Sequence, residues 1–182
     1  MKAALVAVVF FATAALAQDA ALAAAEAACG PAQVQFDAQP AKDQPPAQPE
    51  AGKSLVYVVE VFGEGGNQIG GGPTLRVGLD GKWVGADRPA SYLAFSVDPG
   101  EHHLCTRWQS RLKRLSDRAG FSSFTADPGK VYYFRARIIF EPENSFVLDF
   151  APINEDEGKY LVALSAPSVS HPKKQSSSSH HL

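Results

Sequence analysis

Short apolar runs, some of them continuous and some alternating with polar residues, recur through the middle of the chain. Residues 55–62 form a nearly continuous apolar run, which is typical of a strand covered on both faces. Residues 146–150 alternate, so Phe146, Leu148 and Phe150 are expected on one face and Asp149 in solvent. Further strands are predicted over residues 75–79, 82–85, 92–97, 101–108, 121–125 and 131–140.

The same two-residue period selects the side chains that are expected to face the core. These are Leu93, Phe95, Val97, Leu104, Trp108, Tyr132, Phe134, Ala136, Ile138 and Phe140. The opposite parity places Arg135 and Arg137 outside, and it turns Cys105 away from the face that carries Leu104 and Trp108.

Two Asp-Pro-Gly turns, at residues 98–100 and 127–129, separate predicted strands. Asp can bond to the following backbone, Pro presets φ at the first corner, and Gly supplies the positive φ of the second. We therefore expect each unit to be a strand, a tight turn and an antiparallel strand. Asp80-Gly81 is a strong hairpin signal between residues 75–79 and 82–85. Together these signals predict an all-β fold, a single antiparallel β-sandwich of about seven to nine strands.

The segment with helical spacing near the end of the chain is residues 155–164. It has acids in its first turn and carries Tyr160, Leu161 and Leu164 at helical spacing, so a short C-terminal helix is expected, with a final strand as the alternative. The β-sandwich domain is predicted over residues 52–166 and a disordered tail over residues 167–182. Residues 63–73 contain so many glycines that we expect a mobile loop.

The first 17 residues predict a secretory signal peptide. Lys2 is the only charge before Asp19, residues 3–16 are apolar, and Ala15-Leu16-Ala17 is a small-x-small cleavage pattern that would leave Gln18 first. The apolar run is shorter than the ~20 residues of a membrane-spanning helix, although a retained anchor is the alternative. We therefore expect an exported protein, periplasmic or extracellular, with no transmembrane segment after removal of the signal.

Residues 18–51 are rich in Ala and then in Pro, and they predict an extended N-terminal arm in which residues 34–36 can pair as an edge strand. The two cysteines, Cys29 and Cys105, predict one disulfide between this arm and the sheet, with two free thiols as the alternative. Glu26 lies shortly before Cys29 and outside the apolar run, which argues against a lipid anchor there.

Charge and motifs give little indication of chemistry. The formal net charge is −2, and loss of Lys2 with the signal makes it −3, too small an excess to predict binding to nucleic acid or a membrane surface. A basic cluster extends from Arg107 to Arg118 in a stretch that resembles a loop; it is either a solvated surface or an anion-binding loop. The candidate binding residues are His103, Arg107, Arg111 and Arg114.

No set of residues in the sequence predicts catalysis, a cofactor or a metal. His102 and His103 are consecutive on a predicted strand and point to opposite faces, so we expect a partly buried His102 and an exposed His103 rather than a shared metal site. The chain has no Gly-x-Ser-x-Gly elbow and no phosphate loop. Asp98 and Asp127 are explained as turn residues. We therefore expect a protein that is not an enzyme.

Several motifs together resemble a bacterial family, domain of unknown function 2846. They are Cys29-Gly30-Pro31 and residues 48–53, 78–85, 98–105, 129–135 and 156–160, and the resemblance covers most of residues 29–174. It implies a small exported β-sandwich, similar to surface-layer and carboxypeptidase-regulatory-like modules, with no assigned activity. Some relatives are described as lipoproteins, a pattern from which this chain departs because Cys29 lacks a convincing lipidation box.

The sequence thus predicts a non-enzymatic interaction or structural module of the bacterial cell envelope, whose partner is an unknown envelope protein or glycan. The alternative is a protein that binds a small ligand, an anion or a metal through its Gly-rich and Arg-rich loops.

Overall fold

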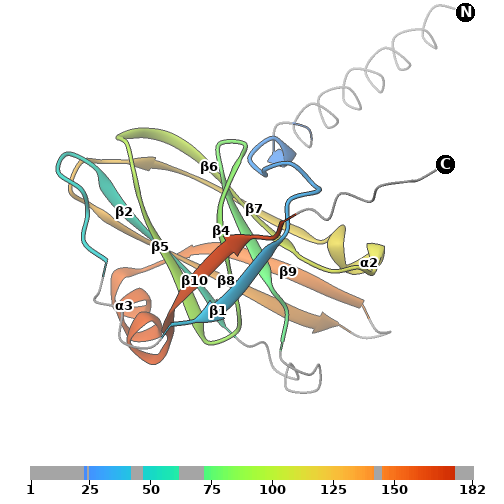
Figure 1. Ribbon diagram of the computed structural model, residues 1–182. Helices are drawn as coiled ribbons and strands as arrows, with labels where there is room; N and C mark the ends of the chain where they lie inside the picture. The colour runs from blue at the N-terminus through green and yellow to red at the C-terminus, as the bar shows by residue number, and fades with distance from the viewer. Residues whose placement is uncertain (1–22, 24, 42–46, 62–71, 142–144, 175–182) are drawn as a thin grey trace, which may run out of the picture.

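The computed structural model describes residues 23, 25–41, 47–61, 72–141 and 145–174 (Figure 1). Strands make up most of this part of the chain, which confirms the all-β class. The predicted signal peptide, nearly all of the Gly-rich loop and the last residues of the predicted tail lie outside the described residues.

The described strands form two sheets. The six-stranded sheet has the order β1 (Phe36–Pro40), β10 (Ala166–Pro172), β5 (Ser91–Val97), β2 (Ser54–Val61), β8 (Val131–Glu141) and β9 (Ser145–Ile153). The four-stranded sheet has the order β4 (Lys82–Asp87), β3 (Leu75–Leu79), β6 (Gly100–Trp108) and β7 (Ala119–Ala126). These are ten strands in the described part of the chain, one more than the predicted range allowed.

Both Asp-Pro-Gly turns form, but each connects the two sheets instead of closing a hairpin within one. The first leads from β5 in the larger sheet to β6 in the smaller, and the second leads from β7 back to β8. Gly100 and Gly129 have φ of 136° and 73°, as expected for the corner residue. The Asp80-Gly81 turn does join two paired strands, β3 and β4, with positive φ at both residues.

The larger sheet is mixed, where a purely antiparallel arrangement was predicted, and the second crossing accounts for one of its two parallel pairings. β2 pairs with β8 in parallel register, and β10 pairs with β5 in parallel register. Because β8 enters from the other sheet, its direction beside β2 is not set by a hairpin. The remaining pairings are antiparallel.

The inner faces of the two sheets share one apolar core. Its buried residues come from β2, β5, β8 and β9 on one side and from β3, β6 and β7 on the other. The predicted inward residues Leu93, Val97, Leu104, Trp108, Phe134, Ala136, Ile138, Phe146, Leu148 and Phe150 belong to it, and Phe95 and Tyr132 pack against it half-buried. The side chain of Phe140 lies outside the described part.

A second apolar cluster covers the outer face of the larger sheet. Helix α3 (Glu155–Leu164) begins at Asn154, whose side chain accepts a hydrogen bond from the Glu157 N–H, and it confirms the predicted C-terminal helix. Leu161 and Val162 of α3 pack toward Leu55, Tyr57, Val59, Tyr92 and Tyr133. Strand β2 is therefore buried on both faces, as its continuous apolar run predicts.

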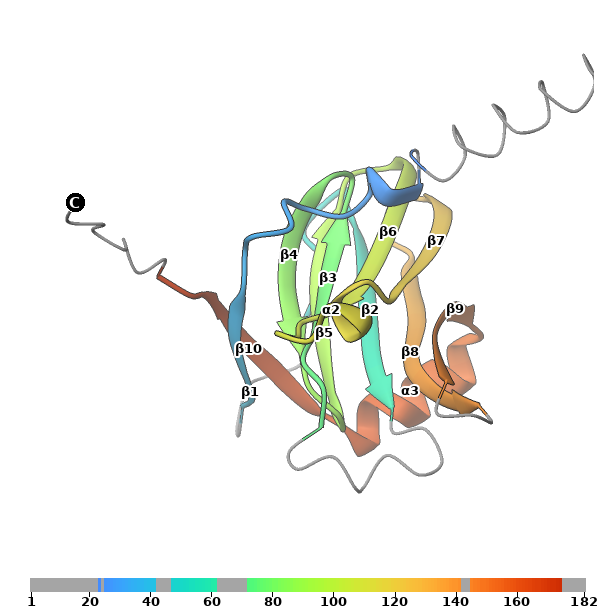
Figure 2. The same ribbon diagram turned by 90° about the vertical axis from the view of Figure 1, so that its right-hand side faces the viewer.

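The C-terminal boundary of the domain was predicted too early. Residues 166–172 form β10, which pairs with β1 and β5. The first six residues of the predicted disordered tail, 167–172, are therefore part of a strand. Polar side chains of β10 also bond the other sheet, because Ser168 Oγ donates to the Ala86 carbonyl and Ser170 Oγ accepts from the Ala86 N–H. Figure 2 shows β1 and β10 beside β4. Alternating Ser residues carry no strong strand signal, and tertiary contacts decide this element.

Candidate functional site: a pocket beside the disulfide

The N-terminal arm is bonded to the smaller sheet by a disulfide. Cys29 and Cys105 are linked, with 5.2 Å between their Cα atoms and a sequence separation of 76. Cys105 is fully buried on the face of β6 opposite to Leu104 and Trp108, as the strand parity predicts. The prediction of a disulfide is therefore confirmed.

Side chains of the smaller sheet hold the arm as well. Arg76 is only 4% exposed, and its Nη1 donates to the Ala32 and Val34 carbonyls at 2.9 and 2.7 Å. Its guanidinium lies 4.4 Å from the ring centre of Trp83, whose indole N–H donates to the Pro31 carbonyl. The arm is thus part of the folded domain over this stretch.

The edge strand predicted in the arm starts later than expected, at Phe36. Here the side-chain amide of Gln109 accepts from the Phe36 N–H at 2.7 Å and donates to the Phe36 carbonyl at 2.8 Å. A single Gln thus satisfies both backbone groups of one β1 residue. This contact joins the arm to the end of β6 and fixes where β1 begins.

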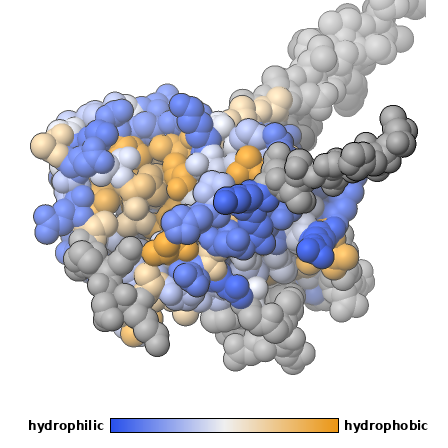
Figure 3. Space-filling view, viewed as in Figure 1, coloured by the Kyte–Doolittle hydropathy of each residue, from blue (hydrophilic) through white to orange (hydrophobic). Residues whose placement is uncertain are grey.

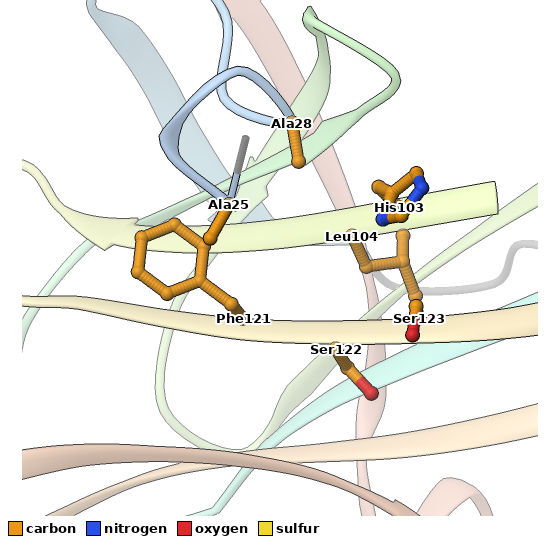
Figure 4. A pocket seen from close by; sticks show the side chains of 7 residues that line it. All are labelled: Ala25, Ala28, His103, Leu104, Phe121, Ser122 and Ser123. Atoms are coloured by element: carbon orange, nitrogen blue, oxygen red, sulfur yellow. The ribbon is translucent and has the colours of Figure 1, made fainter. Parts of the chain in front are cut away.

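A pocket of about 230 Å³ lies between the arm and strands β6 and β7 (Figure 4). Ala25 and Ala28 line it from the arm, and His103, Leu104, Phe121, Ser122 and Ser123 line it from the two strands. His103 and Ser123 are paired across the strands. The volume is below the range of drug-sized ligand sites, so this pocket suits only a small molecule.

The four candidate binding residues fall into two places. His103 and Arg107 lie on the outer face of β6, on either side of Cys105; His103 lines the pocket, and Arg107 is 3.6 Å from a carboxylate oxygen of Glu26 in the arm. Arg111 and Arg114 belong to the connection between β6 and β7, with Arg114 on the one-turn helix α2 (Lys113–Ser116). Part of the predicted basic loop is therefore strand, and Arg107 helps to hold the arm.

His102 lies next to the pocket and links two turns. Its side chain is 12% exposed, against 55% for His103, which confirms the expected contrast between them. Nδ1 is 2.7 Å from Asp80 Oδ2, and Nε2 is 2.7 Å from the Asp98 carbonyl oxygen. Burial by itself lowers the pKa of His102, but the bonds to Asp98 and Asp80 outweigh it, so the pKa lies above its usual value.

A pair of buried carboxyl groups lies farther along the interior and was missed in the sequence. Glu60 on β2 is 2% exposed and Asp87 at the end of β4 is fully buried, and the two carboxyl groups are close enough to affect one another electrostatically. Burial raises the pKa of both groups well above the usual values, because a charge is costly in an apolar interior, and the charge of Asp87 raises the pKa of Glu60 further. One signal was available: Glu60 interrupts an apolar run with the inward parity of Val56 and Val58.

Within the described ranges, no group of three or more His, Cys, Asp or Glu side chains is arranged to hold a metal ion. No helix in those ranges has the length and apolar character needed to cross a membrane. No family model, curated protein or solved structure matches this chain. The resemblance to domain of unknown function 2846 therefore stays a prediction, and the fold and site define only an all-β protein with one disulfide.

Proposed function

We propose that this protein is an exported β-sandwich that serves as a non-enzymatic interaction or structural module of the bacterial cell envelope. The disulfide between Cys29 and Cys105 is the observation that carries the proposal. Disulfides persist in oxidising compartments and are rare in the cytosol, and this bond agrees with the secretory signal predicted in residues 1–17.

Two features support the β-sandwich assignment. The core draws buried side chains from the inner faces of both sheets, as expected for two packed sheets. The chain also passes from one sheet to the other at each Asp-Pro-Gly corner, which is the kind of connection that a sandwich uses.

Exposed apolar side chains support an interaction role. Tyr160 and Leu164 are 64% and 65% exposed and lie one turn apart on α3. Ile139 and Val147 are cross-strand partners on the outer face of β8 and β9, and they are also exposed. Figure 3 shows apolar surface bordered by hydrophilic residues on the face of the molecule seen in Figure 1. Apolar surface of this kind is typical of binding surfaces.

The test determines the cellular location of the protein, the state of its cysteines and whether helix α3 contacts a partner. The full chain is produced in a bacterial host with a two-membrane envelope, fractionated, and treated with a thiol-alkylating reagent before and after reduction. We expect the protein in the periplasmic or extracellular fraction, with no label before reduction and two labels after. A photo-crosslinking residue at Tyr160 should then give one discrete product, whereas the same residue at Lys82, on an exposed position of β4, should not.

Cytoplasmic retention, or two reactive thiols without reduction, would contradict export and the disulfide. Equal cross-linking from Tyr160 and Lys82 would contradict a specific contact through α3.

The pocket favours a second candidate function, the binding of a small ligand. His103, Ser122 and Ser123 place polar groups beside the apolar surface of Phe121 and the two alanines. A thermal-shift screen with anions, sugars and divalent metals tests this, because a ligand that binds only the folded state raises the melting temperature. A specific shift should be lost in Ser123→Phe, which fills the pocket, and retained in Ser110→Phe, which lies outside it.

A further inference from the structure

The ring of His102 faces oxygen acceptors on both sides. Nδ1 is 2.7 Å from the carboxylate oxygen Oδ2 of Asp80, and Nε2 is 2.7 Å from the carbonyl oxygen of Asp98. A carbonyl oxygen cannot donate, and a carboxylate cannot donate either. A neutral imidazole carries one N–H, so it satisfies one of these contacts and leaves two lone pairs facing each other at the other. Only the doubly protonated ring satisfies both.

The groups around His102 favour that cation from each side. Asp80 lies in the turn between β3 and β4, and the carboxylate of Asp98, in the β5–β6 corner, adds negative charge although Lys53 lies 3.8 Å from it. The third neighbour is the uncharged ring of Phe124 on β7, whose centre is 5.6 Å from that of His102. His103 lies on the other face of β6, and its backbone N–H and its ring both favour the ionised form of Asp80.

Asp80 stays ionised and holds more than the histidine. Its Oδ1 accepts from the His103 backbone N–H at 2.8 Å, and its own N–H donates to the His103 carbonyl at 3.0 Å. Burial alone raises the pKa of Asp80, but the bonds from His103 and His102 outweigh it and leave the pKa below its usual value.

The same turn touches both walls of the pocket. The Gly81 N–H donates to the Ala28 carbonyl at 3.1 Å, and Ala28 lines the pocket from the arm. His103, which Asp80 holds through its backbone, lines the pocket from β6. The turn therefore supports the pocket from both sides, in addition to the disulfide that bonds Cys29 of the arm to Cys105 of β6.

We propose that His102 is a proton-dependent clamp on this pocket. As an imidazolium it ties the Asp80-Gly81 turn to the corner at Asp98. Its deprotonation removes one of the two ring hydrogen bonds, frees the turn, and loosens the two pocket walls that the turn supports.

The pKa values of His102 and Asp80 determine how the clamp depends on pH. The pKa of His102 is raised above 6.5, so the clamp is complete below that pH and is lost as the pH rises through the higher folded value. The pKa of Asp80 is lowered below 3.8, so its part of the clamp is lost only when the pH falls below that value. The pocket is thus held at pH values between the lowered pKa of Asp80 and the raised pKa of His102, and it is released as the pH rises through the latter.

Nuclear magnetic resonance on the oxidised full-length mature chain tests the clamp. Nitrogen shifts of His102 should show both ring nitrogens protonated at pH 6 and a titration above pH 6.5. Protection factors for the Gly81 and His103 amides, which correct for the intrinsic pH dependence of exchange, should fall about tenfold through that titration. This is the lower end of the factor expected for losing one hydrogen bond to a charged group.

Variants assign the effect to one histidine. His102→Gln should show low protection of the Gly81 amide at every pH, whereas His103→Gln should keep the wild-type transition. Asp80→Asn should lower the pKa of His102, because it removes the carboxylate. If His102→Gln does not fold, the wild-type titration and His103→Gln decide the matter.

Three outcomes would overturn the proposal. They are a neutral His102 ring at pH 6, protection that does not change across the His102 titration, and a transition that disappears in His103→Gln.

Discussion

Removing the disulfide is the perturbation whose effect the structure allows to be estimated most directly. The double variant Cys29→Ala/Cys105→Ala opens a loop whose ends are 76 positions apart. The chain-entropy relation for a loop of that length predicts a loss of about 4.5 kcal/mol at 25 °C, because the unfolded chain regains freedom that the bridge denied it. This is a large share of the ~5–15 kcal/mol that stabilises a typical domain.

The folded state should survive the change. Arg76, Trp83 and Gln109 hold the arm through hydrogen bonds to four of its residues, and β1 pairs with β10 over five residue pairs. These contacts do not depend on the sulfur atoms. The loss should therefore appear in the unfolded state, with an increase in the urea m-value as that state expands.

Urea unfolding followed by fluorescence of Trp83 and Trp108 measures the difference, with wild-type protein under a non-thiol reductant as a second, chemically reduced form. Both bridge-free forms should lose similar free energy. A loss of less than about 1 kcal/mol with an unchanged m-value would refute the reasoning, since the bridge would then not restrict the unfolded chain.

Three further predictions concern single contacts. Glu60→Gln should raise the urea midpoint relative to wild type at pH 8, and this advantage should disappear toward pH 5. The raised pKa values of Glu60 and Asp87 mean that the stability of the wild-type protein declines as the pH rises through them. A gain in the urea midpoint that does not depend on pH would contradict this explanation. Gly158→Ala should cost about 1–3 kcal/mol in urea unfolding, because the new Cβ would overlap the ring of Tyr133, whereas Ala163→Gly, on the exposed side of α3, should cost only about 1 kcal/mol. Gln109→Ala should cost about 1–2 kcal/mol and speed hydrogen exchange at the Phe36 amide, with no change at Ala38; equal effects at both amides would argue against the bidentate contact.

Local signals in the sequence predicted much of this structure. The apolar run of β2, the alternation in β9 and the Asp80-Gly81 hairpin were all assigned correctly, because each depends on neighbours in the chain. The Asp-Pro-Gly repeat was recognised as two turns, yet the same turn chemistry serves a hairpin and a corner between sheets. Whether the turn closes a hairpin or connects two sheets depends on which strands the next strand pairs with, and the turn residues do not determine that pairing.

For the candidate site, the sequence predicted the faces on which side chains lie but not the residues that they contact. Strand parity was enough to turn Cys105 outward toward the arm and to separate His102 from His103, since that parity is a property of the strand itself. The sequence by itself therefore determined most of the strands, the turns and the faces on which the cysteines and histidines lie, whereas β10 depends on its tertiary contacts. Only the tertiary structure placed Asp80 and Asp98 on either side of His102, brought Glu60 to Asp87 and closed the arm over the pocket. Asp80 and His102, Glu60 and Asp87, and the arm and β6 are far apart in sequence, so no local pattern predicts that they meet. They come together only when the strands pair in this order and the two sheets pack over one core.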